Sequence, residues 1–245
     1  SIAVIGASRF PGKWGYEMAK NLIEGGFSGE IYLINPNGGE ILGHKAYARI
    51  QDVEGSVDLV LIGIKSDQVP RIMKNCYRKG VKGAVIASGG FGEIGKEGRK
   101  LEDEAIRMGR GIRVVGPNTV GIMNTSSKLN ASVLQGPPGP LAIISQSGNI
   151  LDDILYRLER LGLGTSIMVG LGNQADISFH ECLEYLKNDA ATKVILLYIE
   201  SFKDGREFMK VAKQVVKNKP IVALKVGRTE GGMRAAYSHT GSIAS

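Results

Sequence analysis

Residues 1–25 read SIAVIGASRFPGKWGYEMAKNLIEG, and they indicate the fold class more clearly than any other segment. A β-branched run at residues 2–6 is followed by a glycine-rich turn at residues 6–15 and an amphipathic segment at residues 14–25. This order predicts a strand, a turn and a helix. Such a turn brings bare backbone amides and the positive end of a helix together, which is how Rossmann-like domains hold a phosphate. The alternative is a turn with only a structural role.

The same alternation continues along the chain and predicts mainly parallel sheets in an α/β fold. In the first half we expect strands at residues 30–35, 59–64, 83–87 and 112–115, and helices at 68–79 and 96–108. In the second half we expect strands at residues 141–145, 165–169, 193–199 and 221–225, and helices at 149–161, 178–188 and 204–217.

Between these halves, residues 116–140 read GPNTVGIMNTSSKLNASVLQGPPGP, a segment rich in turn-forming residues and without clear periodicity. Such a segment indicates a domain junction. We therefore predict two domains, residues 1–125 and residues 126–245. Because the sequence ends just after a glycine-rich loop, where a further helix is expected, the second domain is predicted to be truncated.

Composition indicates a soluble, cytoplasmic protein, and a small polyanionic ligand would account for its excess of cations as well as nucleic acid would. The formal net charge is +7, but the cations are interspersed with acidic residues and aromatic residues make up only 6% of the chain, which argues against a nucleic-acid partner. No apolar run approaches the roughly 18 residues of a membrane span. The two cysteines, Cys76 and Cys182, suit a reducing compartment and packing roles. The histidines and cysteines have no metal-ligand spacing, so no metal site is predicted.

Two further turns are candidate anion sites. Residues 87–93, ASGGFGE, follow an expected strand and should lie at the same sheet edge as the first turn, so that both line one crevice; the alternative is a surface loop. Residues 145–149, SQSGN, end a strand and begin a helix, which directs hydroxyls and amides at an anion. This second motif is not a nucleophile elbow, because Ser145 stands where that motif has glycine.

The segment SHTGS, residues 238–242, carries the candidate nucleophile, His239. Small residues around the imidazole leave it open to a phosphoryl group. Glu200 follows an expected strand and is the candidate partner: a carboxylate that accepts the Nδ1 proton leaves Nε2 free to attack phosphorus. The alternatives are an inert loop histidine and a solvated glutamate at a strand end. His180, on an amphipathic stretch, and His44, in an expected turn, have no evident partner.

The chain as a whole resembles the α part of ADP-forming acetyl-CoA synthetases and, more distantly, the α subunit of succinyl-CoA synthetase. The resemblance rests on these segments: VIGASRFPGKWGYEMAKNL, INPNGGEILGHKAY, GPNTVGIMN, ISQSGN, LGNQADI, YIESFKDGREF, LKVGRTEGG and SHTGS. It implies a Rossmann-like CoA-binding domain followed by a flavodoxin-like domain. It also implies a reversible ligase reaction, in which acyl-CoA, ADP and phosphate give free acid, ATP and CoA through an acyl phosphate and a phosphohistidine.

The resemblance assigns a role to each motif residue. His239 corresponds to the phosphorylated histidine and Glu200 to the carboxylate that orients it. The positions that correspond to CoA contacts are Gly6, Ser8, Phe10, Pro11, Gly12, Lys13, Asn37, Ile86, Ala87, Ser88 and Gly89. The positions that correspond to the phosphate and acyl-phosphate site are Pro117, Asn118, Ser145, Gln146, Ser147 and Gly148.

One position departs from the family pattern. Relatives usually have lysine where this chain has Asn37, which removes one charged contact to CoA; Lys13, Lys45 and Lys65 are candidates to compensate. The resemblance further implies that ADP or ATP with Mg²⁺ binds only on a separate ATP-grasp module, supplied by a β subunit or a further C-terminal domain of a hetero-oligomer. It leaves the acid and the nucleotide base open.

The sequence is also compatible with two other functions. One is the CoA-binding regulatory region of a protein-lysine acetyltransferase, a class that often lacks a histidine equivalent to His239. The other is a Rossmann-type, NAD-binding redox-sensing module. Against NAD, the glycine after Gly6 is Gly12 rather than the second glycine of G-x-G-x-x-G, and no acidic residue ends the second expected strand.

Overall fold

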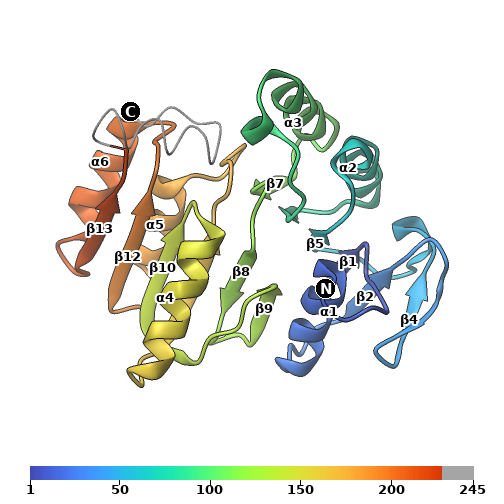
Figure 1. The fold of residues 1–245 in the computed structure, drawn as a ribbon, viewed down its shortest axis with the longest axis horizontal. Helices are drawn as coiled ribbons and strands as arrows, with labels where there is room; N and C mark the ends of the chain where they lie inside the picture. Colours follow the sequence, from blue (N-terminus) through green and yellow to red (C-terminus); the bar gives the residue numbers. More distant parts are fainter. Residues whose placement is uncertain (228–245) are drawn as a thin grey trace.

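The computed structural model describes residues 1–227, which fold around two separate β-sheets (Figure 1). The first sheet is seven-stranded, in the order β3-β4-β2-β1-β5-β6-β7, and the second is six-stranded, in the order β13-β12-β10-β11-β8-β9. The predicted phosphohistidine, His239, lies outside the described residues. In the described part of the chain, no helix is long and apolar enough to cross a membrane.

The first sheet is parallel except for β3. Its strands are β1 Ile2–Ile5, β2 Ile31–Ile34, β3 Gly39–Ile41, β4 His44–Tyr47, β5 Leu59–Ile62, β6 Gly83–Ile86 and β7 Arg113–Val115. Its helices are α1 Trp14–Glu24, α2 Val69–Lys79 and α3 Lys96–Met108, with short 3₁₀ turns at Ile50–Asp52, Ser66–Gln68 and Gly92–Ile94. Every residue of β1 is buried, because α1 packs on one face and α2 with α3 on the other.

The second sheet is built in the same way. Its strands are β8 Gly121–Asn124, β9 Leu129–Ser132, β10 Pro138–Ser145, β11 Thr165–Gly170, β12 Val194–Ile199 and β13 Ile221–Lys225. Helix α4, Gly148–Arg160, covers one face, while α5, Phe179–Lys187, and α6, Gly205–Val215, cover the other (Figure 1). Strands β10 to β13 are parallel, so their carboxyl ends share one edge.

The α/β fold with mainly parallel sheets is confirmed, and most elements end within two residues of their predicted bounds. Two hairpins were not predicted. Strands β3 and β4 form one, so His44 lies in a strand and not in the expected turn. Strands β8 and β9 form the other, inside the turn-rich segment 116–140. Strands of three or four residues with turn formers between them are too short to show periodicity.

The second hairpin bears on the domain division. β8 pairs antiparallel with β11, so residues 121–132 complete the second sheet. The division at residue 125 stays a proposal; it falls between β8 and β9.

Each sheet with its helices forms one unit of the fold. Segments from the two units run side by side where the units meet. The backbone amides of Asn173, Ala175 and Ile177 donate to the carbonyls of Pro117, Gly116 and Val114 at 2.9, 2.8 and 3.0 Å. Arg113 also pairs with Asp176 at 2.9 Å, and this bond raises the pKa of the Arg113 guanidinium. Residues 113–118 of the first unit are therefore anchored to residues 173–177 of the second.

Candidate functional site

The first glycine-rich turn is shaped by two close backbone approaches. Gly6 has a φ of +90°, and a Cβ atom there would lie 2.5 Å from the carbonyl oxygen of Gly63. A Cβ atom on Gly15 would lie 1.9 Å from the carbonyl oxygen of Gly6. Only glycine fits at both positions, so the start of α1 packs directly against the end of β1.

Beyond Ala7 the turn is open to solvent. The Ser8 hydroxyl accepts a 3.0 Å bond from the amide of Phe10, whose side chain is 71% exposed. Pro11, Gly12 and Lys13 are exposed as well. Gly12 has a φ of +79° with open space where a Cβ atom would be, so its glycine is required by conformation and not by crowding. The turn therefore presents an aromatic ring, a cation and backbone to an approaching ligand.

The turns after β2 and β6 lie at the same sheet edge. The Asn35 side chain donates to the carbonyl of Ala7 at 2.8 Å and accepts from the amide of Asn37 at 2.9 Å, which joins the Asn37 turn to the first turn. After β6, Ile86 and Ala87 are buried, and the hydroxyl of Ser88 donates to the carbonyl of Ile64 at 2.5 Å. The predicted CoA-contacting turns thus share one edge, beside Lys13 and Lys65.

In the second unit, residues 145–147 cap the amino end of α4 and are held by hydrogen bonds among themselves. The Ser145 hydroxyl donates to the carbonyl of Ser147 at 2.7 Å and accepts from its amide at 3.1 Å. The hydroxyl of Ser147, the N-cap, accepts from the amide of Ile150 at 3.4 Å. A Cβ atom on Gly148 would lie 2.5 Å from Val120, so the first turn of α4 packs against the start of β8.

Gln146 connects this cap to Glu200. Its side-chain oxygen accepts from the amides of Glu200 and Ser201 at 2.7 and 3.0 Å, and its nitrogen donates to the Ser201 hydroxyl at 3.2 Å. Glu200 directly follows β12, which pairs with β10, and is only 4% exposed. Burial, and secondarily the charge of Glu200, raises the pKa of the neighbouring Tyr198.

The two groups of predicted residues meet at Asn118. Its amide donates to the carbonyl of Ser88 at 2.9 Å, and a Cβ atom on Gly89 would lie 3.3 Å from its side-chain oxygen. The φ of Asn118 is +59°, a conformation that asparagine tolerates better than most residues. Asn118 follows Pro117 and faces a small cavity of about 40 Å³, whose lining is Arg99, Asn118, Gln146, Gly172, Asn173, Glu200 and Ser201.

Four of these lining residues were not predicted from the sequence: Arg99, Gly172, Asn173 and Ser201. Arg99 lies on an amphipathic helix, where a surface arginine is expected and gives no signal. Gly172 and Asn173 belong to the segment LGNQADI, which contributes to the family resemblance but assigns no chemical role to either residue.

His180 has a hydrogen-bond partner, and both cysteines are buried. His180, predicted to have no partner, is hydrogen-bonded through Nδ1 to the hydroxyl of Ser178 at 2.9 Å, since the N-cap of α5 brings them together. Cys76 and Cys182 are buried, and burial raises the pKa of each thiol to about 12. Within residues 1–227, no group of three or more histidine, cysteine or carboxylate side chains is arranged to hold a metal ion.

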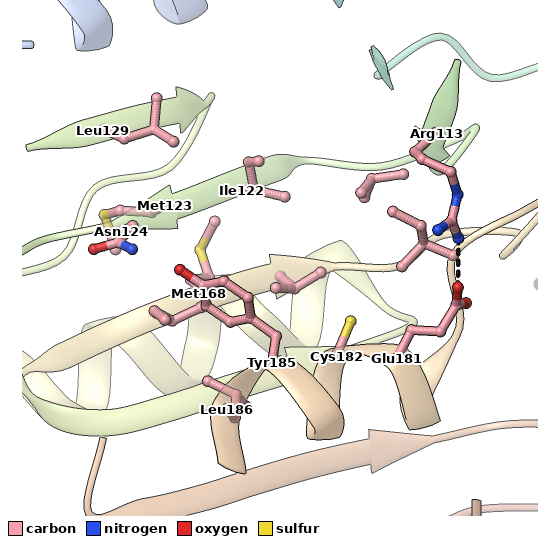
Figure 2. A pocket seen from close by; sticks show the side chains of 14 residues that line it. Arg113, Ile122, Met123, Asn124, Leu129, Met168, Glu181, Cys182, Tyr185 and Leu186 are labelled. Atoms are coloured by element: carbon pink, nitrogen blue, oxygen red, sulfur yellow. Dashed lines mark hydrogen bonds and ion pairs between the residues drawn. The ribbon is translucent and has the colours of Figure 1, made fainter. Parts of the chain in front are cut away.

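A larger groove, of about 380 Å³, lies between β8 and α5 and is mostly apolar (Figure 2). Met123 and Leu129 line one side, and Tyr185 and Leu186 line the other. Arg113 spans one end and pairs with Glu181, so its charge is already compensated. Aliphatic walls and a paired arginine do not suit a phosphate group. The small polar cavity at Asn118 is therefore the better candidate for phosphoryl chemistry.

Two family models match the chain, each over a different part of it. Residues 1–125 match the family model described as a CoA binding domain. Residues 138–245 match the model described as a succinyl-CoA ligase like flavodoxin domain.

Individual relatives point to the same kind of protein. The chain is 47% identical to the α subunit of the ADP-forming acetate–CoA ligase I of Pyrococcus furiosus, over 100% of this chain and 54% of that protein. It is 48% identical to the ADP-forming acetate–CoA ligase of Methanocaldococcus jannaschii, over 100% of this chain and 34% of that protein. The chain thus spans about half or less of the length of these relatives.

Among solved structures, a dinucleotide-forming acetyl-coenzyme A synthetase 1 of Candidatus Korarchaeum cryptofilum, in complex with phosphate and ADP, superimposes with a TM-score of 0.93 at 40% identity. The match covers 100% of this chain and 53% of that one.

Proposed function

Because this chain belongs to the family of ADP-forming acyl-CoA synthetases, as their CoA-binding and succinyl-CoA-ligase-like part, we propose that it binds CoA and carries the phosphohistidine of such an enzyme. The assembled enzyme then converts acyl-CoA, ADP and phosphate into free acid, ATP and CoA. The relatives named above are ligases, and neither an acetyltransferase regulatory role nor an NAD-binding role finds support among them.

The observation that carries the proposal is the contact between the two predicted sites. The amide of Asn118, beside the polar cavity, is bonded to the carbonyl of Ser88, in the predicted CoA turn. A CoA thiol directed along this turn would therefore end close to the cavity that Glu200 and Gln146 line. Thioester cleavage by phosphate requires this proximity between thiol and phosphate.

The chain's own residues have separate tasks in this scheme. The turns around Gly12, Asn37 and Ser88 hold CoA, which supplies the thiol of the thioester. Phosphate attacks the thioester carbonyl, so the C–S bond breaks and an acyl phosphate forms beside the amino end of α4, where backbone amides stabilise the negative charge. Nε2 of His239 then attacks phosphorus, the bond to the carboxylate oxygen breaks, and Glu200 stabilises the charged imidazole through Nδ1–H.

The nucleotide step is proposed to take place outside this chain. Since the relatives are about twice as long or more, the ADP site, its Mg²⁺ and its ATP-grasp fold are assigned to a partner subunit or to a further domain of a hetero-oligomer. Two buried, unpaired cysteine thiols are consistent with the reducing cytoplasm as the compartment. Acyl-CoA-dependent ATP formation by the assembled enzyme, measured with a panel of acids, tests the function and identifies the substrate.

CoA binding by the first unit is directly testable. We expect the 245-residue chain to bind CoA and to give no heat with NAD in titration calorimetry. Gly12→Leu should weaken CoA binding about tenfold, because a side chain in the left-handed region strains the turn and occupies its open face.

Gly162→Leu is the matched control for this variant. Gly162 has a φ of +68° and open space around it. It lies in the turn between α4 and β11, at the edge of the second sheet where the parallel strands begin, away from the predicted site. Both variants should lose similar thermal stability while only Gly12→Leu affects CoA. Tighter binding of NAD than of CoA would overturn the assignment.

The role of α4 gives a second prediction. Asn149 is exposed in the first turn of the helix, and that turn has no acidic residue. Asn149→Asp places a carboxylate where phosphate is proposed to sit, so phosphorylation of His239 should slow about tenfold through like-charge repulsion. Asn218→Asp adds the same charge at the opposite sheet edge and should have no effect. Equal rates in the wild type and Asn149→Asp would show that this helix end does not face the phosphate.

A further inference from the structure

Asn173 occupies a position between two carboxylates of the other unit. Its side-chain nitrogen donates to Glu93 at 2.6 Å and to Glu102 at 2.9 Å. Both acceptors belong to the first unit, whereas Asn173 follows β11 in the second. An amide nitrogen has two hydrogens, so these two bonds use its full donor capacity.

The two carboxylates in turn shape the loop after β6. Glu93 accepts from the amides of Gly90 and Phe91, and Glu102 accepts from the amide of Gly92 at 3.2 Å. Three consecutive amides of the predicted CoA loop are therefore held by the same pair of side chains that Asn173 joins. Glu102 is only 2% exposed, and its other partner is Arg99.

Asn173 also faces the small polar cavity at Asn118, which is the proposed phosphoryl cavity. Its backbone amide donates to the carbonyl of Pro117 at 2.9 Å, and its side-chain oxygen accepts from the Asn118 side chain at 3.5 Å. Asn173 also lines the cavity with Gln146 and Glu200. One side chain thus contacts both the loop predicted to guide CoA and the cavity predicted to receive the phosphoryl group.

We propose that Asn173 is a positioning residue. It holds the loop 87–93 in a fixed position next to the phosphoryl cavity, and so couples CoA binding to acyl-phosphate chemistry. The inference rests on the proposed function. Without the amide, Glu93 and Glu102 lose a shared donor while their negative charges stay close together, and the resulting repulsion displaces the loop. Phosphorylation of His239 from ATP does not involve this loop, so it should respond less to the loss of the amide than CoA binding does.

The test separates the two half-reactions in the assembled enzyme. Asn173→Ala should slow ATP-dependent phosphorylation less than it weakens the use of CoA, because only CoA binding depends on the loop 87–93. It should raise the KM for CoA about tenfold or more when the phosphoenzyme is discharged by acid and CoA, since hydrogen bonds to charged groups are among the stronger ones. Asn173→Asp, which adds a third carboxylate to the cluster, should have a larger effect on the same KM.

A reciprocal pair of substitutions strengthens the test. In the double variant Asn173→Asp with Glu93→Gln, an amide at position 93 faces the carboxylate at position 173, which removes one of the two like-charge contacts, so part of the lost CoA affinity should return. Asn188→Asp, on an exposed asparagine at the end of α5, is the matched control and should behave like the wild type.

Other outcomes would overturn the proposal. Equal losses in both half-reactions with an unchanged KM for CoA would show a general structural role, and wild-type behaviour of Asn173→Ala would show that the contact is not used. If the wild-type enzyme is never phosphorylated, the proposed function fails instead. Calorimetric titration of CoA against the 245-residue chain still tests Asn173 in that case, because weakened CoA binding in Asn173→Ala is expected independently of turnover.

Discussion

Replacement of His239 by alanine should abolish acyl-CoA-dependent ATP formation, with a loss of at least about 10⁴-fold, because no other group in the proposed scheme accepts the phosphoryl group. CoA affinity should stay within about twofold of the wild type, since the predicted CoA turns lie at the edge of the first sheet. The measurement is incubation of the assembled enzyme with labelled ATP or acetyl phosphate, followed by a search for an acid-labile, base-stable phosphoryl group.

The control for this variant is His44→Ala, which removes an exposed imidazole from β4 and should retain both label and turnover. Label on a serine, or full turnover in the His239→Ala enzyme, would show that SHTGS is only a structural loop. Loss of CoA binding together with turnover would point to misfolding rather than to lost chemistry.

The second large effect is expected for Glu200→Gln. Glutamine keeps the shape of the side chain and leaves the backbone bond from residue 200 to Gln146 in place, so the fold should be retained. The neutral amide cannot stabilise a charged imidazole as a carboxylate does. Phosphorylation should therefore slow by about 10²–10⁴-fold, the range typical of general acid–base partners, and remain measurable.

The rate is measured by rapid mixing of the assembled enzyme with labelled ATP, and Glu159→Gln provides the comparison. Glu159 is an exposed glutamate near the end of α4, and its substitution should leave the phosphorylation rate unchanged. A Glu200→Gln enzyme that phosphorylates at the wild-type rate would contradict the orienting role. One that is as inactive as His239→Ala would indicate that the carboxylate does more than orient the ring.

At Gln146 the sequence predicted the local secondary structure but not the partners of the side chain. The motif SQSGN predicted a strand end and a helix start, and the structure has β10 end at Ser145 and α4 begin at Gly148. The hydrogen bonds from the backbone amides of residues 200 and 201 to the Gln146 side chain were not predictable. The pairing of β10 with β12 brings together residues 146 and 200, which are separated by 54 positions.

The sequence by itself determined the α/β class, the order of the long elements and the glycine-rich turns at strand ends. These features depend on local periodicity and backbone conformation, which neighbouring residues control. Gly6 and Gly12, for example, have the positive φ values that such turns require.

Only the tertiary structure decided how the two sets of predicted residues meet. The bond from Asn118 to Ser88 and the bridge from Asn173 to Glu93 and Glu102 each join segments far apart in the chain. Polar side chains such as Asn173 carry no periodic signal, and their partners depend on how the unit of the first sheet meets the unit of the second. Long-range hydrogen bonds of this kind become visible only once the strand order of both sheets and their junction are known.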